Sequence, residues 1–173
     1  MAVNKLVLVG ASGAGKTTWW KRVLTGDFEN LHVPTLGVEV RHVSPQLGYA
    51  PIQIDIWDTA GDQRYIGLGD GYWIGGKAFA VFFDVKRLSS FERAHALAKQ
   101  IRVALPGAPI LLVANKVDQA SRKVTVDMLK DYERKTGIKA IDMSTKSNHN
   151  FDEPIKWAAR QMVGPVDDEG VSA

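Results

Sequence analysis

The sequence contains no cysteine, which removes several kinds of chemistry at once. Disulfide bonds, thiol nucleophiles and thiolate metal sites are all excluded. Prenylation and palmitoylation are excluded as well, because both modifications need a cysteine side chain. The start, MAVNK, also offers no glycine for myristoylation. We therefore expect a protein without a lipid anchor.

Long apolar segments and runs of one charge are missing too. No apolar stretch is long enough to cross a bilayer, and no signal-like leader precedes the first strand-like run. The net charge is +3, but the basic residues are spread along the chain. An anionic small ligand or an acidic protein surface would explain this charge as well as a nucleic acid would. We expect a soluble intracellular monomer that binds neither nucleic acid nor membrane.

What is present suits one compact domain. The chain has 173 residues, of which 45% are hydrophobic and 24% are charged. This composition is ordinary for a globular protein and provides a sizeable core. We expect one domain over residues 1–164 and a short frayed tail over residues 165–173.

Strand-like and helix-like patterns alternate along the chain, which predicts an α/β domain with a mostly parallel sheet. The expected strands are KLVLVG, VEVRHV, IQIDIW, AFAVFFDV, ILLVAN and AIDMS. LGYAP marks the turn between the second strand and the third. The expected helices cover residues 16–25, 90–105, 127–136 and 151–162, with Ser89 or Ser90 capping the second and Gly137 ending the third.

The clearest motif is GASGAGKT at residues 10–17, placed between a strand and a helix. Its glycines let backbone N–H groups point at phosphate oxygens, and the helix N-terminus adds its dipole. Lys16 would place a cation on the β- and γ-phosphates, and Thr17 would ligate Mg²⁺. A chance match is expected in fewer than about one in a hundred chains of this length. The predicted nucleotide-binding residues of this loop are Ser12, Gly13, Ala14, Gly15, Lys16, Thr17 and Thr18.

A second motif, NKVD, ends the ILLVAN strand and comprises Asn115, Lys116, Val117 and Asp118. Asp118 could accept hydrogen bonds from guanine N1–H and from its exocyclic amine. Adenine lacks that N1–H donor, so it would leave the carboxylate unpaired. The stem of Lys116 can cover one face of the base. Alone the pattern could be a polar strand end, but after a phosphate loop it predicts guanine binding.

Two weaker signals complete the predicted base site. Ser144, Thr145 and Lys146 follow the last strand, where their backbone N–H groups can reach guanine O6. Phe28 lies in a polar loop after the first helix. It is equally consistent with a core residue and with an edge contact to the base.

Together these elements resemble the Ras superfamily of small GTPases, from Lys5 to about Met162. Within that superfamily the chain is most similar to the Ran family of nuclear-transport GTPases. The segments that carry this likeness are KRVLTGDFE, TLGVEV, WDTAG, GLGDGYWI, FDV, ANKVD, RKV and KSNHNF. The resemblance implies a P-loop NTPase fold, with a six-stranded, mostly parallel sheet and about five helices.

The resemblance also implies roles for matching residues. Thr35 would ligate Mg²⁺ and contact the γ-phosphate, Asp58 would hold Mg²⁺ through a water, and the Gly61 N–H would touch the γ-phosphate. The two nucleotide-sensing loops, or switches, would span residues 29–37 and 61–76. The implied catalytic group is Lys16, Thr35, Gly61 and Asp62. Implied partners are importin-β-type transport receptors, an exchange factor and a GTPase-activating protein, in nucleus and cytoplasm.

The chain departs from the family pattern at Asp62, which stands where small GTPases use a glutamine to orient the attacking water. An ionised aspartate only accepts hydrogen bonds, is shorter, and would face the anionic phosphate. We therefore expect slow GTP hydrolysis. Two alternatives are a shift that brings in Gln63 and a neutral surface change.

Other departures concern regulation. Ser12 replaces a glycine and can crowd the glutamine and arginine positions, His32 replaces a shielding tyrosine, and Gly69 replaces a basic residue. Only Asp167, Asp168 and Glu169 lie near Ala173, so we expect this protein to lack the acidic tail of the Ran family. We expect a Ran-like guanine-nucleotide switch. The alternatives are a GTP-locked binding module and, disfavoured by NKVD, a P-loop kinase or ATPase.

Overall fold

The computed structural model describes residues 3–30, 33–47, 50–61 and 69–164. Its main element is a six-stranded sheet with strand order β2-β5-β1-β6-β7-β8. These strands are β1 (Lys5–Gly10), β2 (Val38–Val43), β5 (Ile54–Thr59), β6 (Ala78–Asp84), β7 (Ile110–Asn115) and β8 (Lys139–Asp142). Strand β2 runs antiparallel to β5, and the other neighbouring pairs are parallel. The predicted mostly parallel sheet is thereby confirmed.

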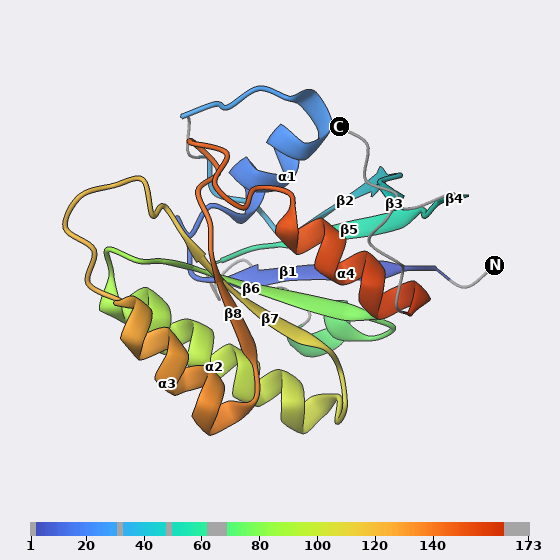
Figure 1. The fold of residues 1–173 in the computed structure, drawn as a ribbon. Coiled ribbons are helices and arrows are strands. Elements are labelled where there is room, and N and C mark those ends of the chain that lie inside the picture. The colour runs from blue at the N-terminus through green and yellow to red at the C-terminus, as the bar shows by residue number, and fades with distance from the viewer. Residues whose placement is uncertain (1–2, 31–32, 48–49, 62–68, 165–173) are drawn as a thin grey trace.

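Helices cover both faces of this sheet (Figure 1). They are α1 (Lys16–Thr25) and α4 (Glu153–Val163) on one face, and α2 (Leu88–Ala104) and α3 (Val126–Thr136) on the other. Successive strand residues point to opposite faces. Strand β1 therefore gives Leu6 and Leu8 to the core under α1 and α4, and Val7 and Val9 to the core under α2 and α3.

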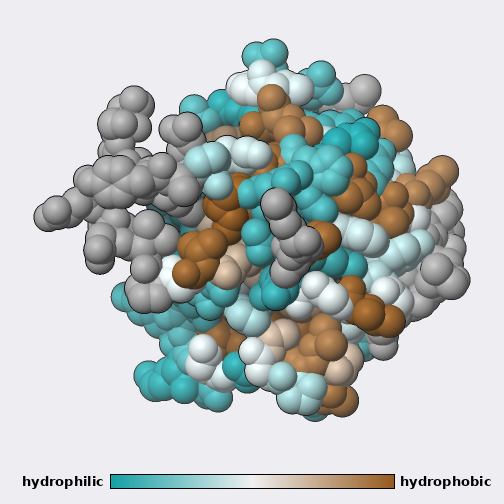
Figure 2. All heavy atoms as spheres, turned by 90° about the vertical axis from the view of Figure 1, so that its right-hand side faces the viewer, coloured by the Kyte–Doolittle hydropathy of each residue, from teal (hydrophilic) through white to brown (hydrophobic). Residues whose placement is uncertain are grey.

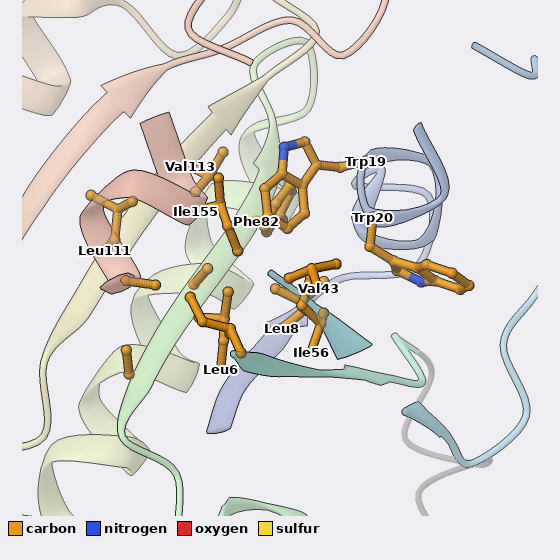
Figure 3. Packing of buried hydrophobic residues seen from close by; sticks show 14 of the residues in the cluster. Leu6, Leu8, Trp19, Trp20, Val43, Ile56, Phe82, Leu111, Val113 and Ile155 are labelled. Atoms are coloured by element: carbon orange, nitrogen blue, oxygen red, sulfur yellow. The ribbon is translucent and has the colours of Figure 1, made fainter. Parts of the chain in front are cut away.

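The core under α1 and α4 is built around aromatic rings (Figure 3). The ring of Trp19 lies 5.6 Å from the ring of Phe82 in β6, and both side chains are fully buried. Ile155 of α4 belongs to the same cluster. Burying rings of this size stabilises the domain and packs α1 against β6.

Capping residues set the ends of α3, whereas the predicted cap of α2 is wrong. Helix α3 begins after Thr125, whose hydroxyl accepts the Met128 N–H. It ends at Gly137, which adopts the left-handed conformation, and this end was predicted. The predicted cap of α2 is wrong, because α2 begins at Leu88 and Ser90 lies inside it. The Ser90 hydroxyl instead accepts the Asp84 N–H at 2.7 Å and so braces the end of β6.

Other boundaries shift by a few residues. Strand β8 ends at Asp142, and α4 begins at Glu153 with a proline in its first turn. The predicted turn between the second strand and the third contains a small antiparallel pair, β3 (Gln46–Leu47) and β4 (Ala50–Pro51). Gly48, which was predicted to make that turn, lies outside the described residues.

In the described part of the chain, four α-helices and a 3-10 helix, η2 (Gly69–Trp73), flank the sheet, where about five helices were predicted. None of these helices is long and apolar enough to cross a membrane. On the face shown in Figure 2, hydrophobic residues lie in separate groups among hydrophilic ones. The predicted tail, residues 165–173, lies outside the described residues.

Candidate functional site

The carboxyl ends of β1, β6 and β7 open onto a cavity of about 440 Å³. Ligands of parallel α/β sheets bind at this edge, and cavities of this size accept small molecules. Nine of the predicted nucleotide-binding residues line it: Gly13, Gly15, Thr18, Phe28, Asn115, Lys116, Asp118, Thr145 and Lys146. The structure therefore brings the phosphate loop and both predicted base motifs to one cavity.

The phosphate loop leaves β1 at Gly10, where two features require glycine. Its φ is +143°, and a Cβ there would lie only 2.2 Å from the Phe82 carbonyl oxygen. The loop then enters α1 at Gly15, which makes no side-chain cap. The first N–H groups of α1 are thus left for another acceptor, and an anion is the partner that a helix N-terminus favours.

Lys16 is buried at the start of α1. Its ammonium donates to the carbonyl oxygens of Gly10 at 2.9 Å and Ala11 at 3.2 Å. Burial lowers the pKa of Lys16 to about 8, and the nearby Asp58 charge opposes this shift. A phosphate would offer the ammonium a stronger, charged partner than two carbonyls.

Thr17, Thr35 and Asp58 meet although they come from three separate segments. Thr17 Oγ1 donates to Asp58 Oδ2 at 2.5 Å and lies 2.8 Å from Thr35 Oγ1. Thr35 Oγ1 also reaches Asp58 Oδ2 at 3.4 Å. Burial raises the pKa of Asp58, and hydrogen bonds from Thr17 and Trp20 oppose that rise. All three residues predicted to hold metal are therefore together.

The chemistry of this cluster fits Mg²⁺. Asp58 Oδ1 is buried and accepts no hydrogen bond from the residues that the structure describes. A buried carboxylate oxygen without a donor is costly unless a cation or water completes it. Mg²⁺ is commonly held by one or two carboxylates together with substrate phosphates. Among the described residues, no group of three or more histidine, aspartate or glutamate side chains could hold a metal.

Gly61 closes the phosphate end of the site. A Cβ at Gly61 would lie 2.5 Å from the Ser12 nitrogen, so its backbone lies directly against the phosphate loop. A small hollow of about 20 Å³ lies there, lined by Ser12, Gly13, Gly15, Lys16, Thr17, Thr18, Thr35 and Gly61. Asp62, Gln63 and His32 lie outside the described residues, so their predicted roles stay predictions.

Asn115 and Lys116 connect the base motif to the phosphate loop. Asn115 is buried and donates to the Ala14 carbonyl at 3.0 Å. Lys116 adopts a positive φ of 69° and donates to the Gly13 carbonyl at 2.7 Å. Its ammonium also pairs with Asp84 at 3.2 Å. Ala14, which was predicted to bind nucleotide, is fully buried and does not line the cavity.

Asp118 is exposed at the far end of the cavity and is held by Ser144. The Ser144 hydroxyl donates to Asp118 Oδ1 at 2.6 Å and accepts the Ser147 N–H at 2.9 Å. Ser144 is fully buried and orients Asp118. Phe28 is half-buried and lines the cavity, which favours its interpretation as a contact to the base.

Four residues near the site were missed by the sequence reasoning. Asp84 and Arg87 line the cavity, and Arg87 donates to the Ser12 carbonyl at 3.1 Å. Asp84 is the last residue of β6 and Arg87 lies just beyond it, so the rule that ligands bind at strand ends could have found them. Arg22 donates to the carbonyls of Thr145 and Lys146 and so braces that loop. Trp20 donates to Asp58, and no sequence pattern signals this bond.

The comparison with known protein families agrees with this geometry. The model of the Ras family matches residues 5–164, which include the phosphate loop, WDTAG, NKVD and STK. Members of this family bind guanine nucleotides with Mg²⁺, hydrolyse GTP, and interact with exchange factors and activating proteins. The match spans most of the chain, so the chain belongs to the Ras family of GTPase switches.

Proposed function

We propose that this protein is a Ran-like switch, which binds GTP and GDP with Mg²⁺, hydrolyses GTP slowly and acts in nucleocytoplasmic protein transport. The main observation in favour of a switch is that the side chains of Thr17, Thr35 and Asp58 contact one another. Thr35 lies in the segment before β2, so its bond to Thr17 links that segment to the phosphate loop. A ligand that engages the Thr35 hydroxyl would favour one arrangement of this segment over others.

Different residues bind different parts of the nucleotide. Lys16 and the N–H groups of the phosphate loop take the phosphates, and Thr17, Thr35 and Asp58 take the metal. When bound, Mg²⁺ neutralises charge on the β- and γ-phosphates. The Gly61 N–H faces the γ-phosphate. On the base side Asp118 reads guanine, with Asn115, Lys116 and the loop of Ser144, Thr145 and Lys146 around it.

Slow hydrolysis is proposed because of Asp62. A glutamine amide can orient the attacking water and also donate toward the γ-phosphate, whereas an ionised carboxylate only accepts. The negative charge of the carboxylate would also face the phosphate. Ser12 lines the small hollow beside Gly61 and leaves less room for an activating group there. Both changes lower the rate of the chemical step.

The transport role rests on the likeness to the Ran family in TLGVEV, GLGDGYWI and KSNHNF. Its partners would be importin-β-type receptors, an exchange factor and a GTPase-activating protein. The protein would work as a monomer in nucleus and cytoplasm. A second candidate is a GTP-locked binding module that occupies such receptors without turnover, favoured by Asp62 and Ser12.

Receptor capture by each nucleotide form tests the transport role. The protein is loaded with GDP or with a non-hydrolysable GTP analogue and is passed over immobilised importin-β. A switch binds at least about tenfold better in the GTP form, because only a difference in affinity can couple the two states. Equal binding of both forms favours the locked module. Capture of neither form contradicts the transport role and leaves membership of the Ras family untouched.

A further inference from the structure

Two adjacent tryptophans on α1 are both buried, but their rings leave the helix in different directions (Figure 3). The Trp19 indole N–H donates to the Phe151 carbonyl oxygen at 2.8 Å, just before α4. The Trp20 indole N–H donates to Asp58 Oδ2, also at 2.8 Å. One tryptophan therefore braces a helix, whereas the other holds the carboxylate of the candidate metal site.

The Trp20 donor differs chemically from the other donors to Asp58. Thr17 and Thr35 offer hydroxyl groups, whose oxygens can turn from the carboxylate to a cation. An indole N–H can only donate and has no lone pair for a metal. When the hydroxyls turn to a cation, Trp20 remains on Oδ2. Oδ1, which lacks a donor among the described residues, would then be free to face the cation or its water.

The surroundings of Trp20 keep its indole in place. Its side chain is 4% exposed and belongs to the same buried cluster as Val43 and Ile56. The Arg41 guanidinium of β2 lies over the ring, 5.5 Å from its centre. The indole is thus packed between α1 and the β2–β5 edge of the sheet, so its hydrogen bond can fix one orientation of Asp58.

We propose that Trp20 is a positioning residue of the magnesium site, which orients Asp58 through its indole N–H. The inference rests on the proposed Mg²⁺ site but not on the Ran-like role. Partners that orient metal-binding groups typically change metal affinity by 10–100-fold when they are removed. The loss of Trp20 should therefore weaken Mg²⁺ binding even though Trp20 touches neither the metal nor the nucleotide.

The test compares Trp20→Phe with Trp19→Phe, each of which keeps an aromatic ring and removes one indole N–H. Release of a fluorescent GDP analogue is followed over a range of Mg²⁺ concentrations, and thermal unfolding of both variants reports the fold. For Trp20→Phe the half-saturating Mg²⁺ concentration should rise by about tenfold or more. For Trp19→Phe it should stay within about twofold of the parent value, whatever the change in melting temperature.

Two results would overturn the proposal, and they are distinguishable. If Trp20→Phe retains the Mg²⁺ dependence of the parent, Trp20 has no positioning role while the magnesium site stands. If GDP release from the parent itself does not depend on Mg²⁺, both the site and the inference fail.

A second measurement needs no folded Trp20 variant. In the GDP-bound parent, titration with Mg²⁺ should shift the NMR signal of the Trp20 indole N–H, because its acceptor gains a cation partner. The chain has five tryptophans, so their indole signals are assigned by sequential backbone NMR, and the Trp19 signal should stay in place. A Trp20 signal that does not respond to Mg²⁺ would overturn the proposal.

Discussion

At the scale of single residues, we propose that the choice of base depends on the negative charge and the acceptor oxygens of Asp118. Its carboxylate is held by the Ser144 hydroxyl at 2.6 Å and lines the cavity. A carboxylate accepts from guanine N1–H and from the guanine amine, whereas an asparagine amide would place a donor against one of them. In the proposed site, the base edge would thus be read by matching donors with acceptors.

We expect Asp118→Asn to lower GTP affinity by roughly a hundredfold, because buried donors would be left unpaired. Xanthosine triphosphate, which carries an oxygen in place of the guanine amine, should bind the variant better than GTP does. Competition against a fluorescent GDP analogue measures both affinities. Asp127→Asn, in the exposed first turn of α3, is the control and should leave both unchanged. An unchanged preference for GTP in Asp118→Asn would remove Asp118 from the base site.

Single residues also show where sequence reasoning stops. The placement of Lys16, Thr17 and Asp118 beside the cavities at one edge of the sheet could be predicted, because phosphate and guanine impose spaced motifs on the chain. Ser90 was predicted to be a helix cap, but its hydroxyl braces the end of β6, a partner set by tertiary packing. The contact of Trp20 with Asp58 was not predicted at all, because a bond between α1 and β5 leaves no pattern in the sequence.

At the scale of elements, the turn from β1 into the phosphate loop has almost no spare room. A Cβ at Gly10 would lie 2.2 Å from the Phe82 carbonyl oxygen in β6, and the φ of +143° adds strain. We expect Gly10→Ala to reduce the free energy of unfolding by at least about 2 kcal/mol. Gly26→Ala is the matched control, since Gly26 has a φ of +79° but a Cβ there would meet no atom within 4 Å.

For Gly26→Ala only the backbone strain applies, so we expect a loss of about 1 kcal/mol. Urea unfolding of both variants beside the parent protein gives the two losses. Similar losses for both variants would show that the contact between β1 and β6 can relax. The close approach at Gly10 would then not be what selects glycine there.

The loop that follows NKVD is joined to β8 by an ion pair. The Arg122 guanidinium contacts both Asp142 oxygens, at 2.6 and 2.8 Å, and both side chains are partly buried. Arg134 pairs with Asp131 on the exposed face of α3. A bidentate, partly buried pair stabilises a fold more than an exposed pair does.

We expect Arg122→Ala to lower the free energy of unfolding by about 1–2 kcal/mol, and Arg134→Ala to lower it by clearly less. Urea unfolding measures both. GDP should also leave the Arg122 variant faster, because this loop carries Asp118 at its start. Equal stabilities of the two variants would contradict a structural role for the Arg122 pair.

The elements themselves were largely predictable, because buried strands and amphipathic helices have distinct periods. The ends of the elements were harder to predict, because caps and neighbouring strands set them. The helix predicted from residue 151 begins at Glu153, and the strand predicted as AIDMS ends at Asp142. The β3 and β4 pair replaced a predicted simple turn, because such short strands carry too few residues for a period-two pattern.

At the scale of the whole molecule, the sheet order brings distant motifs to one edge. Strand β1 lies between β5 and β6, so the phosphate loop emerges between Asp58 and the Asp84–Arg87 segment. Strand β7 then places NKVD beside that segment. The parallel α/β class could be predicted from alternating patterns. Strand order could not be predicted from these patterns, and the meeting of Thr35 with Asp58 was expected only through the family resemblance, because both depend on packing between distant segments.

The central claim is a guanine-nucleotide switch whose hydrolysis is slowed by Asp62, and single-turnover GTP hydrolysis tests it most directly. The parent is compared with Asp62→Gln and with Gln63→Asn, a control for its neighbour. Asp62→Gln should hydrolyse GTP at least about tenfold faster, a change of about 1.4 kcal/mol in activation free energy, and Gln63→Asn should match the parent. Equal rates for the parent and Asp62→Gln, or a loss of hydrolysis in Gln63→Asn, would contradict the account.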